Sequence, residues 1–359
     1  MALRDTNSTP ARDTATPALQ PRIGLALGGG GARGLAHILA LEVFDELGIK
    51  PHIISGTSIG AIFGAAYASG LSASQIRAHA EEMLSNRTDM VRQLFSARNQ
   101  PIRRVLSVFQ LRSALLNPES LLDLVMPTRT ASEFEDLQIP LRIVAADFYT
   151  QDQLIFDAGP LQPAIAASMA LPALFAPVEA EDEIKGSVAL MDGGIVNPLP
   201  FDTIADDVDI TVAIDVSGAG QLPGDRKPPS AFEAIVASAQ IVQKTIVREK
   251  LKLHTPDVLV EVDVGRFHVL EFHKMAEVLD AAQDAKDELR IKLERVLSAE
   301  TLPTIDAPPP IRELREPTRP RSIGRRPKRT EHRTDRSEPA SGSGKRPRLA
   351  DRLLGTATE

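Results

Sequence analysis

An apolar run, Ile23–Leu27, ends abruptly in four consecutive glycines, and apolar residues at helical spacing follow over Leu35–Leu47. The succession then repeats, because the strand-type segment His52–Ser55 ends at Gly56 and a helix of small residues is predicted over Ile59–Ser69. Strand, glycine turn and helix, occurring twice in tandem, are typical of a parallel sheet with helices packed on it. This repeated unit predicts an α/β fold.

The rest of the chain extends this pattern. Strands are predicted at Leu141–Ala146, Gln153–Phe156, Val188–Met191, Ile210–Val216 and Val258–Val262, and helices at Leu71–Leu84, Ala231–Lys252 and His273–Leu297. A Leu-rich insert, 103–126, contains Asn117-Pro118, which is expected to begin a helix with Asn117 as its cap. We expect this insert either to pack in the core or to form an apolar cover near an active site.

Composition divides the chain into three parts. Residues 1–21 are expected to be a flexible leader, residues 22–302 the folded domain, and residues 303–359 a disordered tail rich in Pro and Arg. The tail has 14 basic and 8 acidic side chains, whereas the whole chain has a net charge of −7, so the body is acidic. An acidic body binds nucleic acid poorly, and no nucleic-acid partner is expected. The tail is expected to be a solvated linker or to approach an anionic membrane weakly.

The sequence also limits the compartment and the chemistry. With no cysteine, the chain has no disulfide, thiol nucleophile or cysteine-ligated metal. No apolar run reaches the roughly 18 residues of a membrane-spanning helix, and the N-terminus lacks the apolar stretch of a secretion signal. We therefore expect a cytoplasmic protein, with peripheral contact at the inner membrane surface as a further expectation.

The first glycine cluster matches the dinucleotide-binding pattern G-x-G-x-x-G over Gly29–Gly34. That pattern also requires an acidic residue about 20 positions further on, which binds the ribose hydroxyls. No acidic residue occurs between Glu46 and Glu81, and no Gly-Lys-Ser/Thr follows the glycines as it would in a P-loop. The sequence therefore argues against a nucleotide site.

Two other interpretations of these glycines stay open. They form a tight turn that lets a helix pack close to the sheet, or they present backbone N–H groups to a reacting carbonyl at a helix N-terminus. In the second case Gly29, Gly30 and Gly31 supply an oxyanion hole. Arg33 then adds a positive charge or braces the loop.

The pentapeptide Gly56–Gly60 (GTSIG) matches G-x-S-x-G at the junction of a predicted strand and a predicted helix. Glycines on both sides of Ser58 allow the sharp turn that exposes a nucleophilic hydroxyl. The N–H of Ile59, at the start of the helix, is then expected to join the oxyanion hole. The alternative is an ordinary turn in which Ser58 only caps the helix.

A serine nucleophile needs a base. His254, His268 and His273 occur late in the chain, but none follows a strand in a glycine turn, and each is expected to be a surface or capping residue. His37 is expected to pack or to form a structural hydrogen bond. Asp192 directly follows an apolar strand and precedes two glycines, so its carboxylate is the better candidate base.

Together these motifs resemble the patatin-like phospholipase family. The resemblance rests on Gly28–Gly34 (GGGGARG), Gly56–Gly60 and Asp192-Gly193-Gly194, with support from Ala167-Ser168 through Pro172, Phe175, Pro177 and Asn197-Pro198, and it covers about residues 22–300. It is nearest to bacterial members similar to the neuropathy-target-esterase catalytic domain. It implies a three-layer α/β/α sandwich with a mostly parallel sheet, related to α/β-hydrolases, and a Ser–Asp dyad without a catalytic histidine.

Carried onto this chain, the resemblance makes Ser58 the nucleophile, Asp192 the base, and the glycine amides with Arg33 the oxyanion hole. The motif glycines are Gly34, Gly56, Gly60, Gly193 and Gly194. The expected reaction is acyl-ester hydrolysis of a phospholipid or lysophospholipid, of phospholipase A or lysophospholipase type. The alternatives are a thioesterase or short-chain carboxylesterase with the same dyad, and a catalytically idle lipid-binding regulator. No cofactor is expected, and no metal, because the seven histidines are scattered.

Overall fold

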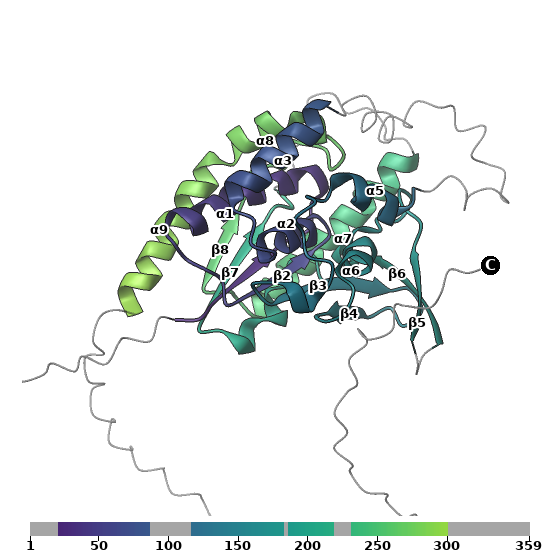
Figure 1. Ribbon diagram of the computed structural model, residues 1–359, viewed down its shortest axis with the longest axis horizontal. Helices are drawn as coiled ribbons and strands as arrows, with labels where there is room; N and C mark the ends of the chain where they lie inside the picture. Colours follow the sequence, from purple (N-terminus) through teal and green to yellow (C-terminus); the bar gives the residue numbers. More distant parts are fainter. Residues whose placement is uncertain (1–20, 87–115, 183–185, 219–230, 301–359) are drawn as a thin grey trace, which may run out of the picture. The chain divides into compact units, whose positions relative to one another are not determined.

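The computed structural model describes residues 21–86, 116–182, 186–218 and 231–300. Within these residues one 8-stranded sheet has the order β5-β6-β3-β2-β1-β7-β8, and β4 pairs with β3 (Figure 1). The strands are β1 (Ile23–Leu27), β2 (Ile53–Thr57), β3 (Leu141–Asp147), β4 (Gln153–Phe156), β5 (Val178–Asp182), β6 (Gly186–Asp192), β7 (Ile210–Asp215) and β8 (Val258–Glu261). Seven of these strands were predicted, and β5 was not.

The register of the sheet brings the end of β2, which precedes Ser58, close to Asp192 at the end of β6. Strands β3, β2, β1, β7 and β8 are parallel, whereas β4 and β6 run antiparallel to β3 and β5 runs antiparallel to β6. Thr57 on β2 pairs with Val144 on β3, and the next residue of β3, Ala145, pairs with Asp192 on β6. Strand β4 pairs with the other edge of β3, so β2 and β6 pair with successive stretches of the same edge and their ends meet there.

Helices surround this sheet. They are α1 (His37–Glu46), α2 (Ile59–Ala68), α3 (Ala73–Asn86), α5 (Pro118–Val125), α6 (Leu161–Met169), α7 (Ala231–Leu253), α8 (Met275–Ala281) and α9 (Gln283–Glu300). Short 3-10 helices are η1 (Gly31–Ala36), η5 (Phe134–Asp136), η6 (Gly193–Ile195), η7 (Phe201–Thr203), η8 (Ala205–Asp207) and η9 (Phe272–Lys274). The α/β fold class and the mostly parallel sheet predicted from the sequence are thus confirmed.

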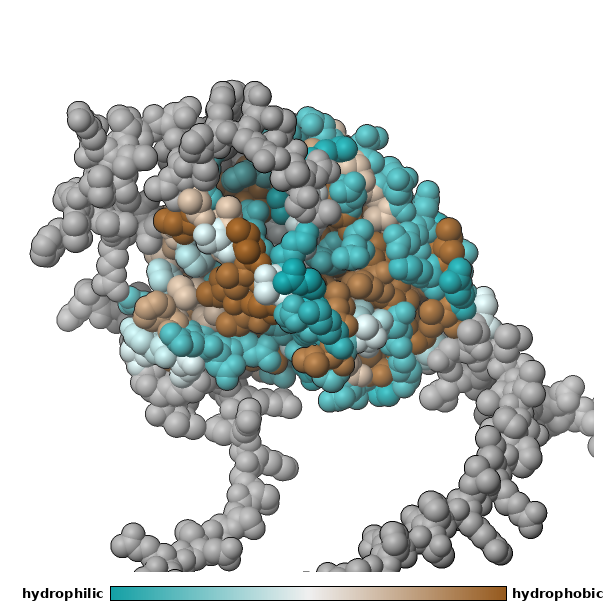
Figure 2. All heavy atoms as spheres, turned by 180° about the vertical axis from the view of Figure 1, so that it is seen from behind, coloured by the Kyte–Doolittle hydropathy of each residue, from teal (hydrophilic) through white to brown (hydrophobic). Residues whose placement is uncertain are grey.

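The two faces of the sheet are covered unequally. A large apolar cluster joins one face to α1, α2, α3 and α9. A smaller cluster on the other face joins Ala26, Ile53 and Ala213 to side chains of the 199–204 segment and to Val247 of α7. Figure 2, a view from behind, shows hydrophobic side chains gathered in a patch among hydrophilic ones. On α7, Ile235, Ile241 and Val242 are exposed.

Several element boundaries differ from the sequence-based prediction. The helix predicted over 35–47 begins as the 3-10 helix η1, and the one predicted over 273–297 is two helices separated at Ala282. Helix α6 was not predicted; it accommodates Pro163 because that residue lies in the first turn, where its missing N–H has no intrahelical partner. Asn117 caps α5 as predicted, since its side chain accepts a 3.0 Å hydrogen bond from the Ser120 N–H.

Some predictions fall wholly or partly outside the described residues. These are the 1–21 leader, the 303–359 tail and the first part of the Leu-rich insert. In the described ranges, no helix is both long and apolar enough to cross a membrane.

Candidate active site

Ser58 lies in a strained turn between β2 and α2. Its φ and ψ angles are 55° and −120°, a conformation that residues with a side chain rarely adopt and that is held by the surrounding structure. The hydroxyl makes no capping bond to α2. It donates instead to Asp192 Oδ2 at 2.7 Å, and the Ser58 N–H donates to Ser168 Oγ at 2.8 Å. The interpretation of Ser58 as a helix cap is therefore wrong.

Asp192 is buried at the end of β6 and accepts two hydrogen bonds. One comes from the Ser58 hydroxyl and the other from the Gly194 N–H, at 2.7 Å to Oδ1. Burial raises the pKa of Asp192 to about 6, although both hydrogen bonds act in the opposite direction. A carboxylate whose pKa lies this close to neutrality is better matched to accepting a proton from a hydroxyl than an ordinary aspartate.

The glycine loop after β1 has both occupied and available N–H groups. Gly29 donates to Pro198 O at 2.9 Å, and Ala32 donates to Val269 O at 2.8 Å. Gly30 and Gly31 open η1, where the first N–H groups lack an intrahelical acceptor, and both residues line the cavity beside Ser58. The Gly29 N–H is thus already used, which argues against its predicted role as an oxyanion donor, whereas Gly30 and Gly31 remain candidates.

The Ser58 turn and the glycine loop are in close contact. A Cβ on Gly60 would lie 2.1 Å from the carbonyl oxygen of Leu27, and one on Gly34 would lie 2.3 Å from the side chain of Ile59. Both distances are far below van der Waals contact, so a side chain at either position would force the two motifs apart. Ile59 starts α2 and lines the cavity with Gly30 and Gly31, so its N–H remains a candidate oxyanion donor beside theirs.

Arg33 braces the loop rather than facing the cavity. Its guanidinium donates to Phe267 O at 2.7 Å and to Ser217 O at 2.6 Å, with a longer bond to Gly265 O at 3.4 Å. Burial lowers the pKa of Arg33, opposed by the charge of Glu271. Of the two roles predicted for Arg33, these contacts support bracing, and the direct contribution to an oxyanion hole is not what the geometry favours.

His37 supports the glycine loop through a buried hydrogen bond. Its ring is fully buried and Nε2 donates to Gly28 O at 2.8 Å, while Nδ1 has no hydrogen-bond partner among the residues that the structure describes. Burial lowers the pKa of His37 to about 4, so the ring is neutral at pH 7. The predicted structural role of His37 matches these contacts.

The three histidines between 254 and 273 lie outside the cavity beside Ser58. His254, His268 and His273 do not line the cavity, whereas His79 does and bonds through Nε2 to Val125 O at 2.9 Å. Within the described residues, no group of three or more His, Cys, Asp or Glu side chains is arranged to hold a metal ion.

A cavity of about 160 Å³ opens beside Ser58 and Asp192. Apart from the dyad and the glycine loop, its wall is almost entirely apolar. The wall includes Ile62, Phe63 and Ala66 of α2, Ile76, Ala80, Met83 and Leu84 of α3, Leu121 and Val125 of α5, and Val236 and Ala239 of α7. The described part of the Leu-rich insert therefore does both things predicted for it, because Leu122 packs in the core while Leu121 and Val125 line the cavity. The contributions of α3 and α7 have no sequence signal beyond ordinary amphipathic spacing.

Comparison with known proteins identifies the fold family. A model of patatin-like phospholipases matches residues 25–205, a span that contains both Ser58 and Asp192. The chain belongs to the patatin-like phospholipase family. Patatin-like phospholipases are acyl ester hydrolases of lipids.

Individual relatives agree with this assignment. An uncharacterized NTE family protein of Mycobacterium tuberculosis is 35% identical over 211 residues, which cover 58% of this chain and 53% of the relative. Patatin-like phospholipase domain-containing protein 7 of Rattus norvegicus is 34% identical over 195 residues, 54% of this chain and 13% of the relative. The patatin-like chain spans about half the length of the mycobacterial relatives it matches. Among solved structures, VipD from Legionella pneumophila has a TM-score of 0.39 at 14% identity, covering 76% of this chain and 67% of VipD.

Proposed function

We propose that this chain hydrolyses the acyl ester bond of a phospholipid or lysophospholipid with a Ser58–Asp192 dyad. The observation that carries the proposal is the 2.7 Å hydrogen bond from the Ser58 hydroxyl to the buried Asp192 carboxylate. The hydrolase domain is proposed to occupy residues 22–302, with the tail outside it. Membership of the patatin-like phospholipase family supports a lipid ester as the substrate.

In the proposed reaction, Ser58 Oγ attacks the ester carbonyl carbon while its proton passes to Asp192 Oδ2. The negative charge that forms on the carbonyl oxygen is stabilised by the N–H groups of Gly30, Gly31 and Ile59 at two helix N-termini. Collapse of the tetrahedral intermediate breaks the C–O bond, and Asp192 returns the proton to the departing alcohol. A water molecule then attacks the acyl–Ser58 ester with Asp192 again acting as the base, which releases the fatty acid and restores the serine.

The apolar cavity is proposed to hold the acyl chain. Apart from the dyad and the glycine loop, its polar side chains are Gln240, Gln243 and His79, and His79 Nε2 bonds to Val125 O. An alkyl chain gains about 0.8 kcal/mol for each CH₂ removed from water, whereas a polar head group would lose hydration there. The head group is therefore proposed to remain near the mouth, and the ester to lie beside Ser58.

Lipid substrates also require contact with a membrane or micelle. We propose that this contact is peripheral, because exposed Ile235, Ile241 and Val242 lie on α7, whose Val236 and Ala239 line the cavity. The basic tail, 303–359, is proposed to add attraction to anionic lipids, at about 1 kcal/mol for each Lys or Arg near the surface.

The proposal is tested by labelling the purified chain with a fluorophosphonate and mapping the modified residue by mass spectrometry. Ser58 is the expected site, and the Ser58→Ala variant should remain unlabelled. Release of fatty acid from phospholipid, lysophospholipid, acyl-thioester and short-chain ester should then be compared. Exclusive turnover of the thioester or the short ester would replace the lipid assignment with one of those activities. Absence of both labelling and turnover would favour a catalytically idle lipid-binding protein.

A further inference from the structure

One dipeptide, Asn197-Pro198, contacts all three segments of the proposed site. The Asn197 carbonyl accepts a 2.8 Å hydrogen bond from Thr57 Oγ1, and Thr57 directly precedes Ser58. The Pro198 carbonyl accepts the Gly29 N–H at 2.9 Å, one residue before Gly30. The Asn197 N–H donates to Gly193 O at 2.8 Å, one residue after Asp192. The position of this dipeptide therefore helps to set the positions of the nucleophile, the oxyanion donors and the base.

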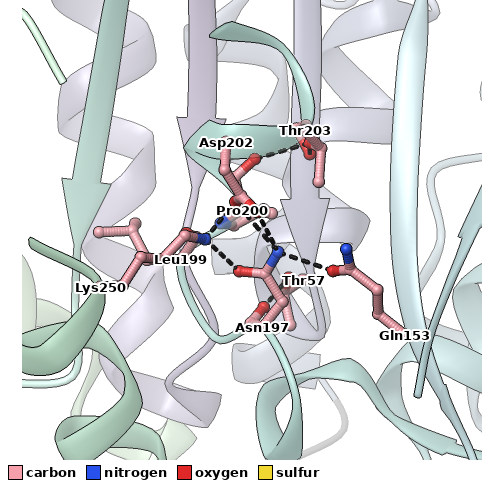
Figure 3. Close-up of polar contacts among 9 residues, drawn as sticks. Thr57, Gln153, Asn197, Leu199, Pro200, Asp202, Thr203 and Lys250 are labelled. Atoms are coloured by element: carbon pink, nitrogen blue, oxygen red, sulfur yellow. Dashed lines mark hydrogen bonds and ion pairs between the residues drawn. The ribbon is translucent and has the colours of Figure 1, made fainter. Parts of the chain in front are cut away.

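The side chain of Asn197 is held by polar partners on every side (Figure 3). Oδ1 accepts a 2.6 Å hydrogen bond from Lys250 Nζ, while Nδ2 donates to Gln153 Oε1 at 2.9 Å and to Asp202 Oδ1 at 3.1 Å. Asn197 itself is 3% exposed, so its amide is buried although Gln153 and Asp202 reach the surface. Because both the oxygen and the nitrogen of the buried Asn197 amide are hydrogen-bonded, the side chain is held in one orientation, and this restrains the Asn197 backbone.

Lys250 connects Asn197 to several neighbouring groups. Besides Asn197, its ammonium group donates to Leu199 O at 2.9 Å and to the Asp202 carboxylate, and it lies 4.6 Å from the centroid of the Phe201 ring. All three ammonium donors therefore have acceptors. Burial lowers the pKa of Lys250, and the charge of Asp202 opposes that shift. Lys250 lies in α7, beyond residues 25–205 that the family model matches. The contact between Lys250 and Asn197 therefore joins a residue outside that span to one inside it.

We propose that Lys250 and Asn197 are positioning residues that hold the Asn197-Pro198 dipeptide, and through it the Ser58 turn, the glycine loop and Asp192, in the geometry for hydrolysis. This inference rests on the proposed function. Neither side chain lines the cavity, so neither is expected to touch the substrate. Their loss should lower the rate of the chemical step and leave substrate binding almost unchanged, since a misplacement of about 1 Å costs roughly a hundredfold in rate.

The test compares Lys250→Met with Lys252→Met in the same helix. Lys252 has an exposed side chain and pairs only with Glu249 among the described contacts, so its loss should change nothing at the site. For each folded variant we would measure kcat and KM on a soluble ester, the rate of fluorophosphonate labelling of Ser58, and the melting temperature. Lys250→Met is expected to lower kcat and the labelling rate at least tenfold with KM within twofold, and Lys250→Arg to restore part of kcat. A kcat within twofold of the parent, with only a lower melting temperature, would overturn the proposal.

A second variant keeps the test decisive if Lys250→Met does not fold. Gln153 is exposed, so Gln153→Leu should preserve the fold while removing one acceptor of the Asn197 amide. Its kcat is expected to fall threefold to tenfold, and an unchanged kcat and labelling rate would overturn the inference. The parent chain separates this result from the proposed function. If the parent neither hydrolyses esters nor becomes labelled at Ser58, the proposed function itself fails.

Discussion

Ser58 and Asp192 are separated by 134 positions in the chain, yet the hydroxyl of one donates to the carboxylate of the other at 2.7 Å. The pairing is a consequence of strand register. Strands β2 and β6 pair with successive stretches of one edge of β3, so the residue after Thr57 meets Asp192 where the two strands end. The contact between Ser58 and Asp192 is thus set by the sheet and does not depend on a long loop folding back.

Removing either member of the dyad should abolish turnover. We expect Ser58→Ala and Asp192→Asn each to lower kcat/KM at least about a thousandfold, and the double variant to be no worse than either single one, because both groups act in one step. Steady-state kinetics on a soluble ester would measure this, with Ser238→Ala on the exposed face of α7 as the control. A histidine substitution that abolishes turnover without unfolding the chain would contradict the assignment.

The pH dependence of hydrolysis should report Asp192. Its pKa is raised to about 6, so the carboxylate form that accepts the proton is lost below that pH. We expect kcat/KM to rise with pH through an inflection near 6 and then to level off. His79 is the histidine that lines the cavity, so His79→Gln is the matched control and should leave the inflection in place. Disappearance of the inflection in this variant would assign it to the histidine instead.

Stability should depend on Asp192 in the opposite sense from activity. Because the folded-state pKa of about 6 exceeds the ordinary value of 3.8, the folded chain binds this proton more tightly than the unfolded chain. The free energy of unfolding therefore falls as pH rises from about 4 to about 6, by roughly 3 kcal/mol. The Asp192→Asn variant has no carboxyl group to titrate at this position. Its free energy of unfolding, measured by urea denaturation and compared with that of the parent, should therefore increase over the same pH interval.

The comparison with the parent is necessary because His37 acts over an overlapping interval. Its pKa is lowered to about 4, so protonation of the unfolded chain below about pH 6.5 destabilises the fold as pH falls. The contribution of His37 is the same in the parent and in Asp192→Asn, so it cancels when their free energies of unfolding are subtracted. A difference that does not change between pH 4 and pH 7 would mean that Asp192 is not desolvated in solution.

Narrowing the cavity should select against long acyl chains. Ala80 is buried on α3 and lines the cavity, so Ala80→Phe should lower kcat/KM for long-chain esters about tenfold while sparing acetyl or butyryl esters. Ala78→Phe adds the same ring to the exposed side of the same helix and is the matched control. Equal losses for short and long esters would place the acyl chain elsewhere.

Deleting 303–359 should weaken binding to membranes without affecting chemistry. The tail has 14 basic side chains, so the truncated chain should bind anionic vesicles less tightly, with the largest difference at low salt. Turnover of a soluble ester should be unchanged, and binding to zwitterionic vesicles should differ little. Equal binding of both chains to anionic vesicles at low ionic strength would rule out this role.

Most of the sheet could be predicted from the sequence because its parallel strands are buried on both faces and read as continuous apolar runs. The Ile23–Leu27 and Ile210–Val216 segments are of this kind, and both became strands. Strand β5 (VEAED) has no such run, because alternate positions are acidic. Helix α6 was missed because Pro163 lowers helix propensity, although its place in the first turn makes it harmless.

The candidate site was predictable where residue type and local context coincide. A serine between two glycines after a strand, and an aspartate before two glycines after another, identify Ser58 and Asp192 without any distance information. The sequence could not indicate which glycine N–H was already occupied, since Gly29 donates to Pro198, far away in the chain. Nor could it pair Lys250 with Asn197, because a lysine near a helix end is ordinarily solvated.

The register of β6 against β3 determines where an insertion would displace Asp192. Because Asp192 ends a strand whose register against β3 is fixed, residues added before β6, in its link to β5, would leave the carboxylate in place. A single residue inserted within β6 would rotate every later side chain to the opposite face and remove the base from Ser58. Length variation in this part of the fold should therefore accumulate between β5 and β6 and be absent from the strand itself.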